Sequence, residues 1–350
     1  MPIETAKLID VHAHVRLEAT NGAAGVHGPE HGVDENGLPW YRVGNYRLSG
    51  VRHANSPFTD PELRLQRMER AGIDFQVLSA SPLNYFHHID VPSAVSFCRR
   101  HNDAMAELVN RYPDRLGGLA ALPMQDPLAA KEELERAVTE LGLWGAATGT
   151  EFAGEPLHSP AFDPLYETFV ALDVPLFLHP APAGIDGPPG DPALKRFDLD
   201  VIIGFAAQET IAVATLIFGG VLERHPALDV WISHGGGAAA FTAGRLAQAG
   251  MKRPWASQSM KKDGAFEEML SRLWFDTHLN DSRALDLLTR VVGPERLVFG
   301  TNFAGWDQPE DGHRGPVSPA LADNARRLLR KNGTRTSKTQ QGKTQQGGTP

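Results

Sequence analysis

Eight short apolar segments recur along the chain, and a helix-like stretch follows most of them. The segments are continuously apolar instead of alternating, which is typical of parallel strands buried on both faces. Eight such units predict an α/β fold, a distorted (β/α)8 TIM barrel with its helices outside. A doubly wound open sheet has the same local rhythm, but the Gly-x-Gly-x-x-Gly motif is absent after the first segment. The expected strands are Lys7–His12, Ile73–Ser79, Leu116–Leu122, Gly145–Gly149, Pro175–His179, Val230–His234, Leu273–Thr277 and Arg296–Gly300.

Apolar residues recur with helical spacing between these strands. The expected helices are Pro61–Ala71, Ala94–Arg111, Leu128–Leu141, Phe162–Leu172, Ala206–Arg224 and Arg283–Val292. Residues 1–330 are therefore expected to form one barrel domain. Residues 331–350 are polar and contain a Lys-Thr-Gln-Gln-Gly repeat, a composition typical of a disordered tail.

Histidines stand at or just beyond the ends of three expected strands: His12, His14, His179 and His234. In an extended strand, the side chains of His12 and His14 point to the same face, so both can bind one divalent cation. Imidazole suits zinc and also manganese, iron or cobalt. His-x-His alone is equally consistent with hydrogen bonding in a core. The matching positions of His179 and His234 favour a metal site, because barrel chemistry sits at the carboxyl ends of strands.

Two insertions, 15–60 and 180–200, begin directly after histidines of this set and are expected to be lids after strands 1 and 5. The first is expected to be a loop rich in arginine and aromatic residues. The second has too many Gly and Pro residues for regular structure. Arginine matches carboxylate geometry, which predicts a small anionic carboxylic-acid substrate, with Arg47 as the preferred contact. For each single arginine, a weak ion pair on the surface is the alternative.

Composition excludes several classes of partner. The net charge is −8, from 34 basic and 42 acidic residues, which argues against nucleic acid. No apolar stretch is long enough to span a membrane, and the amino terminus contains no signal segment. The single cysteine, Cys98, cannot form an internal disulfide, so a cytoplasmic location is expected.

The motifs together resemble the amidohydrolase superfamily. They are IDVHAH at 9–14, FLHP at 177–180, SHGGG at 233–237 with TAGRL at 242–246, and LVFGTNF at 297–303. The closest likeness is to its decarboxylase branch, which includes α-amino-β-carboxymuconate-ε-semialdehyde decarboxylase, γ-resorcylate decarboxylase and 5-carboxyvanillate decarboxylase. The resemblance covers about Lys7 to Arg330.

The resemblance implies one divalent metal, usually zinc or manganese, held by His12, His14 and His179, with zinc expected here. His234 would act beside the metal as an acid/base or water-orienting group, or hold a ligand in place. The implied reaction is non-oxidative decarboxylation of an aromatic or muconate-like acid by a homodimer.

Further candidates in the same regions have two interpretations each. Arg245 would bind a substrate carboxylate or reach a partner subunit, or else form a helix-surface ion pair. Trp306 would be a pocket wall or a loop packing residue. The glycines at 235–237 give the backbone room beside the metal, and a phosphate-binding loop is the lesser alternative because the Lys-Ser/Thr signature is absent.

One position departs from the branch. Where the decarboxylases have a metal-binding aspartate after the eighth strand, this chain has Asn302. An amide oxygen is a neutral ligand and cannot carry a proton. Asn302 is either a ligand or a near neighbour of the metal, unless Asp307, Asp276 or Glu151 supplies the carboxylate.

Three functions remain open from the sequence. The first is decarboxylation by a carbon–carbon lyase. The second is metal-assisted hydrolysis or hydration at the same site. The third is a catalytically degenerate barrel that binds a small acid or a partner, for which Asn302 is the support.

Overall fold

The computed structural model describes residues 1–50, 55–152, 154–182, 185, 191–303, 305, 307–308 and 318–331. Its centre consists of two parallel sheets whose strands are buried along their whole length. This burial on both faces explains why the strands read as continuous apolar segments. The first sheet contains β1 (Ile9–Val15), β5 (Phe75–Ala80) and β6 (Leu116–Gly118). The second contains, in order, β7 (Ala120–Ala121), β8 (Ala146–Thr148), β9 (Leu176–Leu178), β10 (Val230–Ile232), β11 (Trp274–Asp276) and β12 (Leu297–Val298).

Every expected strand segment contains a strand, so the parallel α/β architecture is confirmed. The segment 116–122 is divided into β6 and β7 at Leu119, whose N–H donates to the carbonyl of Leu78 (2.9 Å). On the opposite edges, Val11 N–H donates to Phe299 O (2.9 Å) and Phe303 N–H donates to His12 O (3.0 Å). These bonds link the two sheets, but the regular ladder is not continuous around the strands.

The expected helices are present with small shifts at their ends, and the sequence explains their starts. Asp60 caps α1 by accepting hydrogen bonds from the N–H groups of Glu62 and Leu63, and Pro61 occupies the first turn. The segment expected at 206–224 is interrupted at 219–220 and forms two helices. The helices are α1 (Pro61–Ala71), α2 (Val91–Arg111), α3 (Pro127–Thr139), α4 (Asp163–Leu172), α5 (Leu199–Ile202), α6 (Gly204–Phe218), α7 (Val221–Arg224), α8 (Ala239–Lys252), α9 (Ala265–Leu270), α10 (Ser282–Val292) and α11 (Pro319–Leu328).

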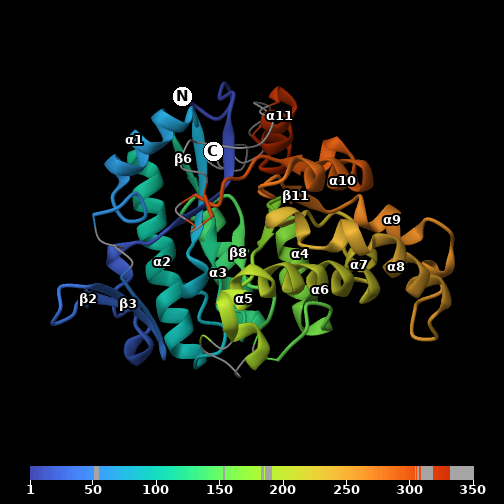
Figure 1. Ribbon diagram of the computed structural model, residues 1–350, viewed down its shortest axis with the longest axis horizontal. Helices are drawn as coiled ribbons and strands as arrows, with labels where there is room; N and C mark the ends of the chain where they lie inside the picture. Colours follow the sequence, from blue (N-terminus) through green and yellow to red (C-terminus); the bar gives the residue numbers. More distant parts are fainter. Residues whose placement is uncertain are drawn as a thin grey trace, which may run out of the picture.

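The first insertion differs from its expectation as a loop. It contains an antiparallel sheet of β2 (Glu30–Val33), β3 (Pro39–Val43) and β4 (Tyr46–Ser49). Figure 1 shows β2 and β3 at the lower left beside α2, on the side opposite α8 and α9. Tyr41 and Val43 are buried, whereas the residues between and around them are partly exposed, so one face of β3 packs inward.

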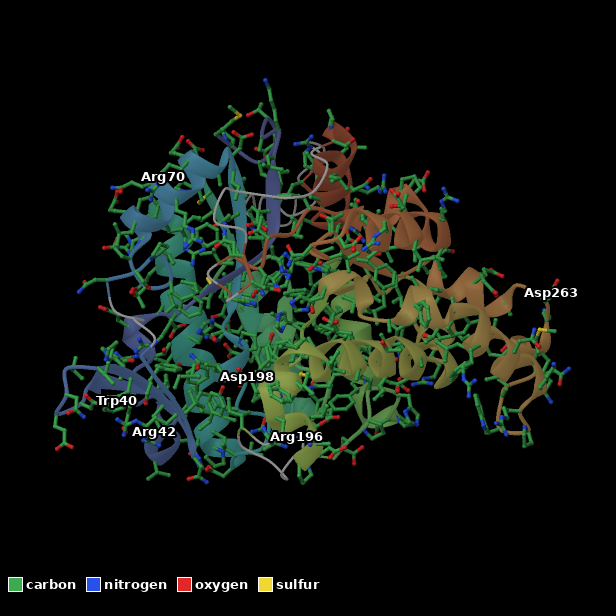
Figure 2. All side chains as sticks on the ribbon, viewed as in Figure 1. Trp40, Arg42, Arg70, Arg196, Asp198 and Asp263 are labelled. Carbon is green, nitrogen blue, oxygen red and sulfur yellow. The ribbon has the colours of Figure 1, made fainter. Side chains whose placement is uncertain are left out.

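The second insertion also differs from its expectation where the structure describes it. Residues Pro192–Asp198 form consecutive 3-10 turns, and α5 follows directly. Figure 2 places Arg196 and Asp198 of this segment at the lower centre of the molecule. Residues 183–184 and 186–190 lie outside the described residues, as do residues 332–350 of the expected tail.

Within the described residues, no single helix is both long and apolar enough to cross a membrane. One pair of helical segments, 192–202 and 204–218, passes that test together but is bent by 80°.

Candidate metal centre

Four histidines from three strands of the core converge. The nitrogens of His12, His179 and His234 lie within 4.8 Å of one another. His14 Nε2 lies 3.2 Å from His12 Nε2, and the ring centroids of His14 and His179 are 4.7 Å apart. Two nitrogens bound to one ion at about 2.1 Å stand about 3.0–3.4 Å apart, so the His12–His14 spacing suits a shared cation. The three histidines within 4.8 Å of one another therefore differ from the predicted ligands in one member, because they include His234 and not His14.

Hydrogen bonds on the far side of the rings leave the Nε2 atoms available. His12 Nδ1 donates to Asp276 Oδ2 (2.7 Å), and His179 Nδ1 donates to the carbonyl of Pro180 (2.7 Å). His14 Nδ1 lies 3.1 Å from Ser79 Oγ. Because a carbonyl only accepts, His179 Nδ1 carries the proton and its Nε2 has a free lone pair. That Nε2 is buried and has no hydrogen-bond partner among the described residues, which fits a metal ligand.

Burial keeps these imidazoles neutral, as metal ligands must be. It lowers the pKa of His12 to about 4, although Asp276 opposes the shift. Burial and the neighbouring histidines hold the pKa values of His14 and His179 well below the usual range. The donor set therefore fits a divalent cation.

A buried polar network holds the strand that carries His12 and His14. Asp10 Oδ1 accepts from the His12 N–H (3.1 Å), and Asp10 Oδ2 accepts from Gln76 Nε2 (2.9 Å). Arg64 donates to Gln76 Oε1 (2.9 Å) and to the carbonyl of His14. The network joins β1 to β5 and α1. This network was not predicted, although Asp10 and Gln76 are polar residues within apolar strands.

His234 is coupled to a buried carboxylate on α6. Its Nδ1 donates to Glu209 Oε1 (2.7 Å), which also accepts from the Ser233 hydroxyl. Burial lowers the pKa of His234, but the charge and hydrogen bond of Glu209 outweigh it and raise the value to about 9. His234 is therefore cationic where the other three imidazoles are neutral. Glu209 was not among the predicted site residues, although it is the only charged residue in the apolar segment 204–218.

Asn302 is held by the carboxylate of Asp307, which lies two positions beyond Gly305. Its backbone is left-handed, with φ of +51°, a conformation that asparagine tolerates. Asn302 Nδ2 donates to Asp307 Oδ1 (2.6 Å), and His278 Nε2 donates to Asp307 Oδ2 (2.9 Å). A Cβ at position 305 would lie 2.4 Å from the Asn302 amide, so Gly305 is required there. Asn302 Oδ1 is buried and has no partner within the described part of the chain.

The candidate replacement carboxylates differ in what they contact. Burial would raise the pKa of Asp307, but His278, His234 and Asn302 lower it to about 2. Asp276 uses Oδ2 for His12, while its Oδ1 accepts from the N–H groups of Gly235 (3.3 Å) and His278 (3.0 Å). Asp276 therefore orients His12. The Glu151 residue is exposed.

His278 belongs to the histidine cluster, although it was not among the predicted site residues. Its ring centroid lies 6.0 Å from that of His12 and 5.7 Å from that of His234. Its only signal in the sequence is its location just after the seventh expected strand.

The two predicted substrate contacts that the structure describes are both exposed. Arg47 is exposed on β4 and stacks over the ring of Trp40 at 4.7 Å. Figure 2 shows Trp40 at the lower left, on the antiparallel sheet. Arg245 is exposed on α8. Trp306 lies outside the described residues.

The three glycines after His234 allow a tight, left-handed turn of the backbone. His234 has φ of +44°, and Gly235, Gly236 and Gly237 have φ of 61°, 75° and 63°. A Cβ on Gly237 would lie 2.1 Å from the Ala206 carbonyl oxygen, and one on Gly236 would lie 2.6 Å from the Phe275 ring. The run thus turns tightly between β10 and α8, as expected from the interpretation that it gives the backbone room.

Known proteins match most of the chain. The 2-amino-3-carboxymuconate-6-semialdehyde decarboxylase of Dictyostelium discoideum is 31% identical over 252 residues, which are 72% of this chain and 68% of that protein. The γ-resorcylate decarboxylase of a Rhizobium species is 30% identical over 294 residues, covering 78% of this chain and 88% of that enzyme. A 2-keto-4-carboxy-3-hexenedioate hydratase of a Sphingobium species is 27% identical over 251 residues, 69% of each chain.

The fold also matches solved structures. A dihydroxybenzoic acid decarboxylase from a Polaromonas species, with bound manganese and the inhibitor 2-nitroresorcinol, gives a TM-score of 0.71 at 24% identity. The match covers 93% of this chain and 97% of that enzyme. The sequence model of the amidohydrolase family matches residues 9–335, the region that contains every histidine of the cluster, and the chain therefore belongs to the amidohydrolase family.

Proposed function

We propose that this protein is a metal-dependent, non-oxidative decarboxylase, a carbon–carbon lyase that acts on an aromatic or muconate-like carboxylic acid. The observation that carries the proposal is the pairing of neutral, metal-competent imidazoles with a cationic one. His179 Nε2 is buried and unpartnered among the described residues, and His234 beside it is held in its protonated form by Glu209. The decarboxylase relatives support the same reaction.

In this proposal, His12, His14 and His179 hold one divalent ion, with zinc as the first choice and manganese as the alternative. An ion held there would supply Lewis acidity toward substrate oxygens. Asp276 and the Pro180 carbonyl orient two of the three rings by accepting their Nδ1 protons. Asn302 Oδ1, a neutral oxygen that is buried and unpartnered among the described residues, would be a direct or near ligand.

His234 supplies the proton that replaces the lost carboxylate. Breaking the bond to carbon dioxide leaves an electron pair on the substrate carbon, and that carbon must take up a proton. Glu209 occupies Nδ1, so His234 presents Nε2–H to the substrate. Asn302 cannot carry a proton, so this task falls to His234.

Substrate contacts from Arg47, Arg245 and Trp306 remain part of the proposal. We also propose that the enzyme is a cytoplasmic homodimer whose partner is a small anionic acid, and not nucleic acid or a membrane. The net charge of −8 and the single cysteine support these assignments.

The test compares His179→Ala with His158→Ala, a histidine exposed at the surface. Metal content is measured by elemental analysis, and carbon dioxide release is measured with hydroxybenzoates and muconate-like acids. The His179→Ala protein should lose metal and turnover, while the control keeps both. Full metal occupancy in the His179→Ala protein would contradict the assignment.

Hydration or hydrolysis at the same centre is the second candidate, which the neutral Asn302 and the hydratase relative favour. Water uptake without carbon dioxide release would identify it. Absence of bound metal, with no gain in activity when metal is added, would instead favour the third hypothesis, in which the protein is a non-catalytic binder of small acids or partners.

A further inference from the structure

Arg16 is a buried cation whose donors are mostly unused. It directly follows β1, and only 1% of it is exposed. Its Nη2 donates to Asn21 Oδ1 (2.6 Å). Its Nε and Nη1 are buried and have no hydrogen-bond partner among the described residues. Buried polar groups are nearly always paired, so two unpaired nitrogens on one guanidinium require an explanation.

The surroundings of Arg16 compensate its charge only in part. The guanidinium carbon lies 4.6 Å from the centre of the Tyr41 ring, so one face is covered by an aromatic ring. Burial lowers the pKa of Arg16, while the charge of Tyr41, a side-chain hydrogen bond with Tyr41 and the charge of Glu18 oppose the shift. Arginine nevertheless stays charged in proteins. Within the described ranges, neither Nε nor Nη1 has a carboxylate as a hydrogen-bond partner.

Position connects Arg16 to the histidines. His12, His14 and Arg16 follow one another at intervals of two residues, so alternation along the strand predicts the same face for all three. Arg16 lies about 7 Å beyond His14 along the chain, at the carboxyl end of β1. Tyr41, which covers it, donates from its hydroxyl to Asn84 Oδ1 (2.5 Å), and Asn84 comes shortly after the end of β5. Arg16 is thus at the catalytic end of the sheet, under the first insertion.

We propose that Arg16 binds a second anionic group of the substrate, a carboxylate that is not the one lost, so that the enzyme prefers dicarboxylic acids. The free Nε–H and Nη1–H groups can each donate a charge-assisted hydrogen bond to a carboxylate oxygen. This inference rests on the proposed function, which places the reacting end of the substrate at the histidines. It differs from the sequence-based choice of Arg47, whose guanidinium is exposed and stacked on Trp40.

The test uses two probes with the same carbon chain. Muconate (hexa-2,4-dienedioate) carries two carboxylates, and sorbate (hexa-2,4-dienoate) has a methyl group in place of one of them. Dissociation constants of both are measured by calorimetry for the parent, Arg16→Met, Arg47→Met and Arg290→Met proteins. Arg290 is an exposed arginine on α10 and serves as the matched control. Arg16→Gln provides the same comparison if Arg16→Met does not fold.

The parent should bind muconate about 10- to 100-fold more tightly than sorbate, the range expected for hydrogen bonds to a charged group. Arg16→Met should remove this preference by weakening muconate, with sorbate changed less than about threefold, as apolar contacts are kept. Arg290→Met should keep the full preference. Equal binding of both probes by the parent, or a preference that survives Arg16→Met, would overturn the proposal. A preference lost only in Arg47→Met would assign the role to Arg47 and overturn it too.

Repeating the titrations after chelation separates this inference from the proposed function. Anion selection by Arg16 should persist in the metal-free protein, because the guanidinium does not depend on the ion. A chain that selects muconate through Arg16 but releases no carbon dioxide would contradict the proposed function alone. A chain that releases carbon dioxide without this selection would contradict the inference alone.

Discussion

Asn302 and Asp307 together provide two features that a single aspartate would combine, a buried side-chain oxygen and a negative charge. The amide supplies a neutral oxygen, and the carboxylate lies one hydrogen bond away, 2.6 Å from Asn302 Nδ2. A carboxylate introduced at position 302 would meet that of Asp307 without a proton between them. The two positions are therefore electrostatically coupled, and neither can be changed independently.

We expect Asn302→Asp alone to lower the melting temperature, because two carboxylates would be in contact. The double variant Asn302→Asp, Asp307→Asn restores one donor and one acceptor with the roles reversed. It should bind the metal about 10-fold more tightly than the parent, since an anionic oxygen replaces a neutral one. Competition titration with a chelator at one pH measures this. Unchanged affinity in the double variant would mean that Asn302 does not face the metal.

His14 and His234 compete for the third position beside His12 and His179. We expect His14→Ala to lose metal as His179→Ala does, and His234→Ala to keep most of the metal while losing most of the rate. The reason is that His234 is cationic through Glu209, and a cation is a poor ligand. Elemental analysis of both variants decides the matter. Equal metal loss in both would make His234 a ligand, in line with its distance from His12 and His179.

At the scale of elements, the turn from β10 into α8 requires glycine at position 237, whereas helix α8 tolerates replacement of the glycine at position 244. Gly237 has φ of +63°, and its Cβ would collide with the Ala206 carbonyl oxygen, whereas Gly244 lies within α8 and its Cβ would meet nothing within 4 Å. Gly237→Ala should lower the free energy of unfolding by at least about 2 kcal/mol. Gly244→Ala should raise it by about 0.5–1 kcal/mol, because alanine favours a helix interior. Urea denaturation checks both, and equal effects would contradict the described turn.

Helix α2 carries a histidine that makes stability depend on pH. His101 is buried, stacks on Phe97, and has no hydrogen-bond partner for either ring nitrogen among the described residues. Burial lowers its pKa to about 4. The unfolded chain, with a value near 6.5, takes up the proton first, so His101 costs stability as the pH falls from about 6.5 toward 4.

His101→Leu should remove that dependence. The variant should gain about 2 kcal/mol more in unfolding free energy at pH 5 than at pH 8, relative to the parent. Urea denaturation at the two pH values measures the difference, with His158→Leu as an exposed control that should show no such change. An identical gain at both pH values would contradict the burial of a neutral imidazole.

Two elements that were not predicted, the hairpin of β3 and β4 and helix α11, had local sequence signals of different kinds. The hairpin of β3 and β4 turns at Gly44 and Asn45, a pair typical of tight turns. Strands with one buried face alternate apolar and polar residues, so they do not form the continuous apolar segments by which the other strands were predicted. Helix α11 begins with Ser318 as its cap and Pro319 in its first turn. Only the buried parallel strands and the strongly periodic helices were predictable from period alone.

At the scale of the whole molecule, exposed apolar residues on the α6–α8 side fit an interface. Ile203 is 53% exposed, Ile211 61% and Phe241 81%, and α6 packs against α8. The segment 211–218 otherwise points inward, with Val213, Leu216 and Ile217 buried. The apolar character of that segment thus reflects packing more than assembly.

If the homodimer uses this face, Phe241→Glu should shift the chain from dimer to monomer, because a buried unpaired charge disfavours the interface. Light scattering over a range of concentrations measures the mass. Leu128→Glu, at another exposed apolar position, is the control and should leave the mass unchanged. A dimer that persists in Phe241→Glu would place the interface elsewhere.

The candidate site was predictable where its residues are local and not where they depend on tertiary pairing. His12 and His14 are two residues apart and reveal themselves by spacing. Glu209 comes from a helix and joins His234 only through the fold, and the unpaired state of Arg16 exists only because the chain buries it. Sequence reveals which residues can bind a metal, whereas the partners that set their charge come from packing.

The polar network beneath His12 and His14 also bears on how the ion and the fold are linked. Asp10, Gln76 and Arg64 hold β1 through bonds that involve no metal, so the chain does not need to fold around the ion. Loading the site then orders few residues and buries little new apolar surface, and the heat capacity of binding stays close to zero. We therefore expect the cation to be an exchangeable ligand of a preformed site, so that its removal stops the reaction without unfolding the protein.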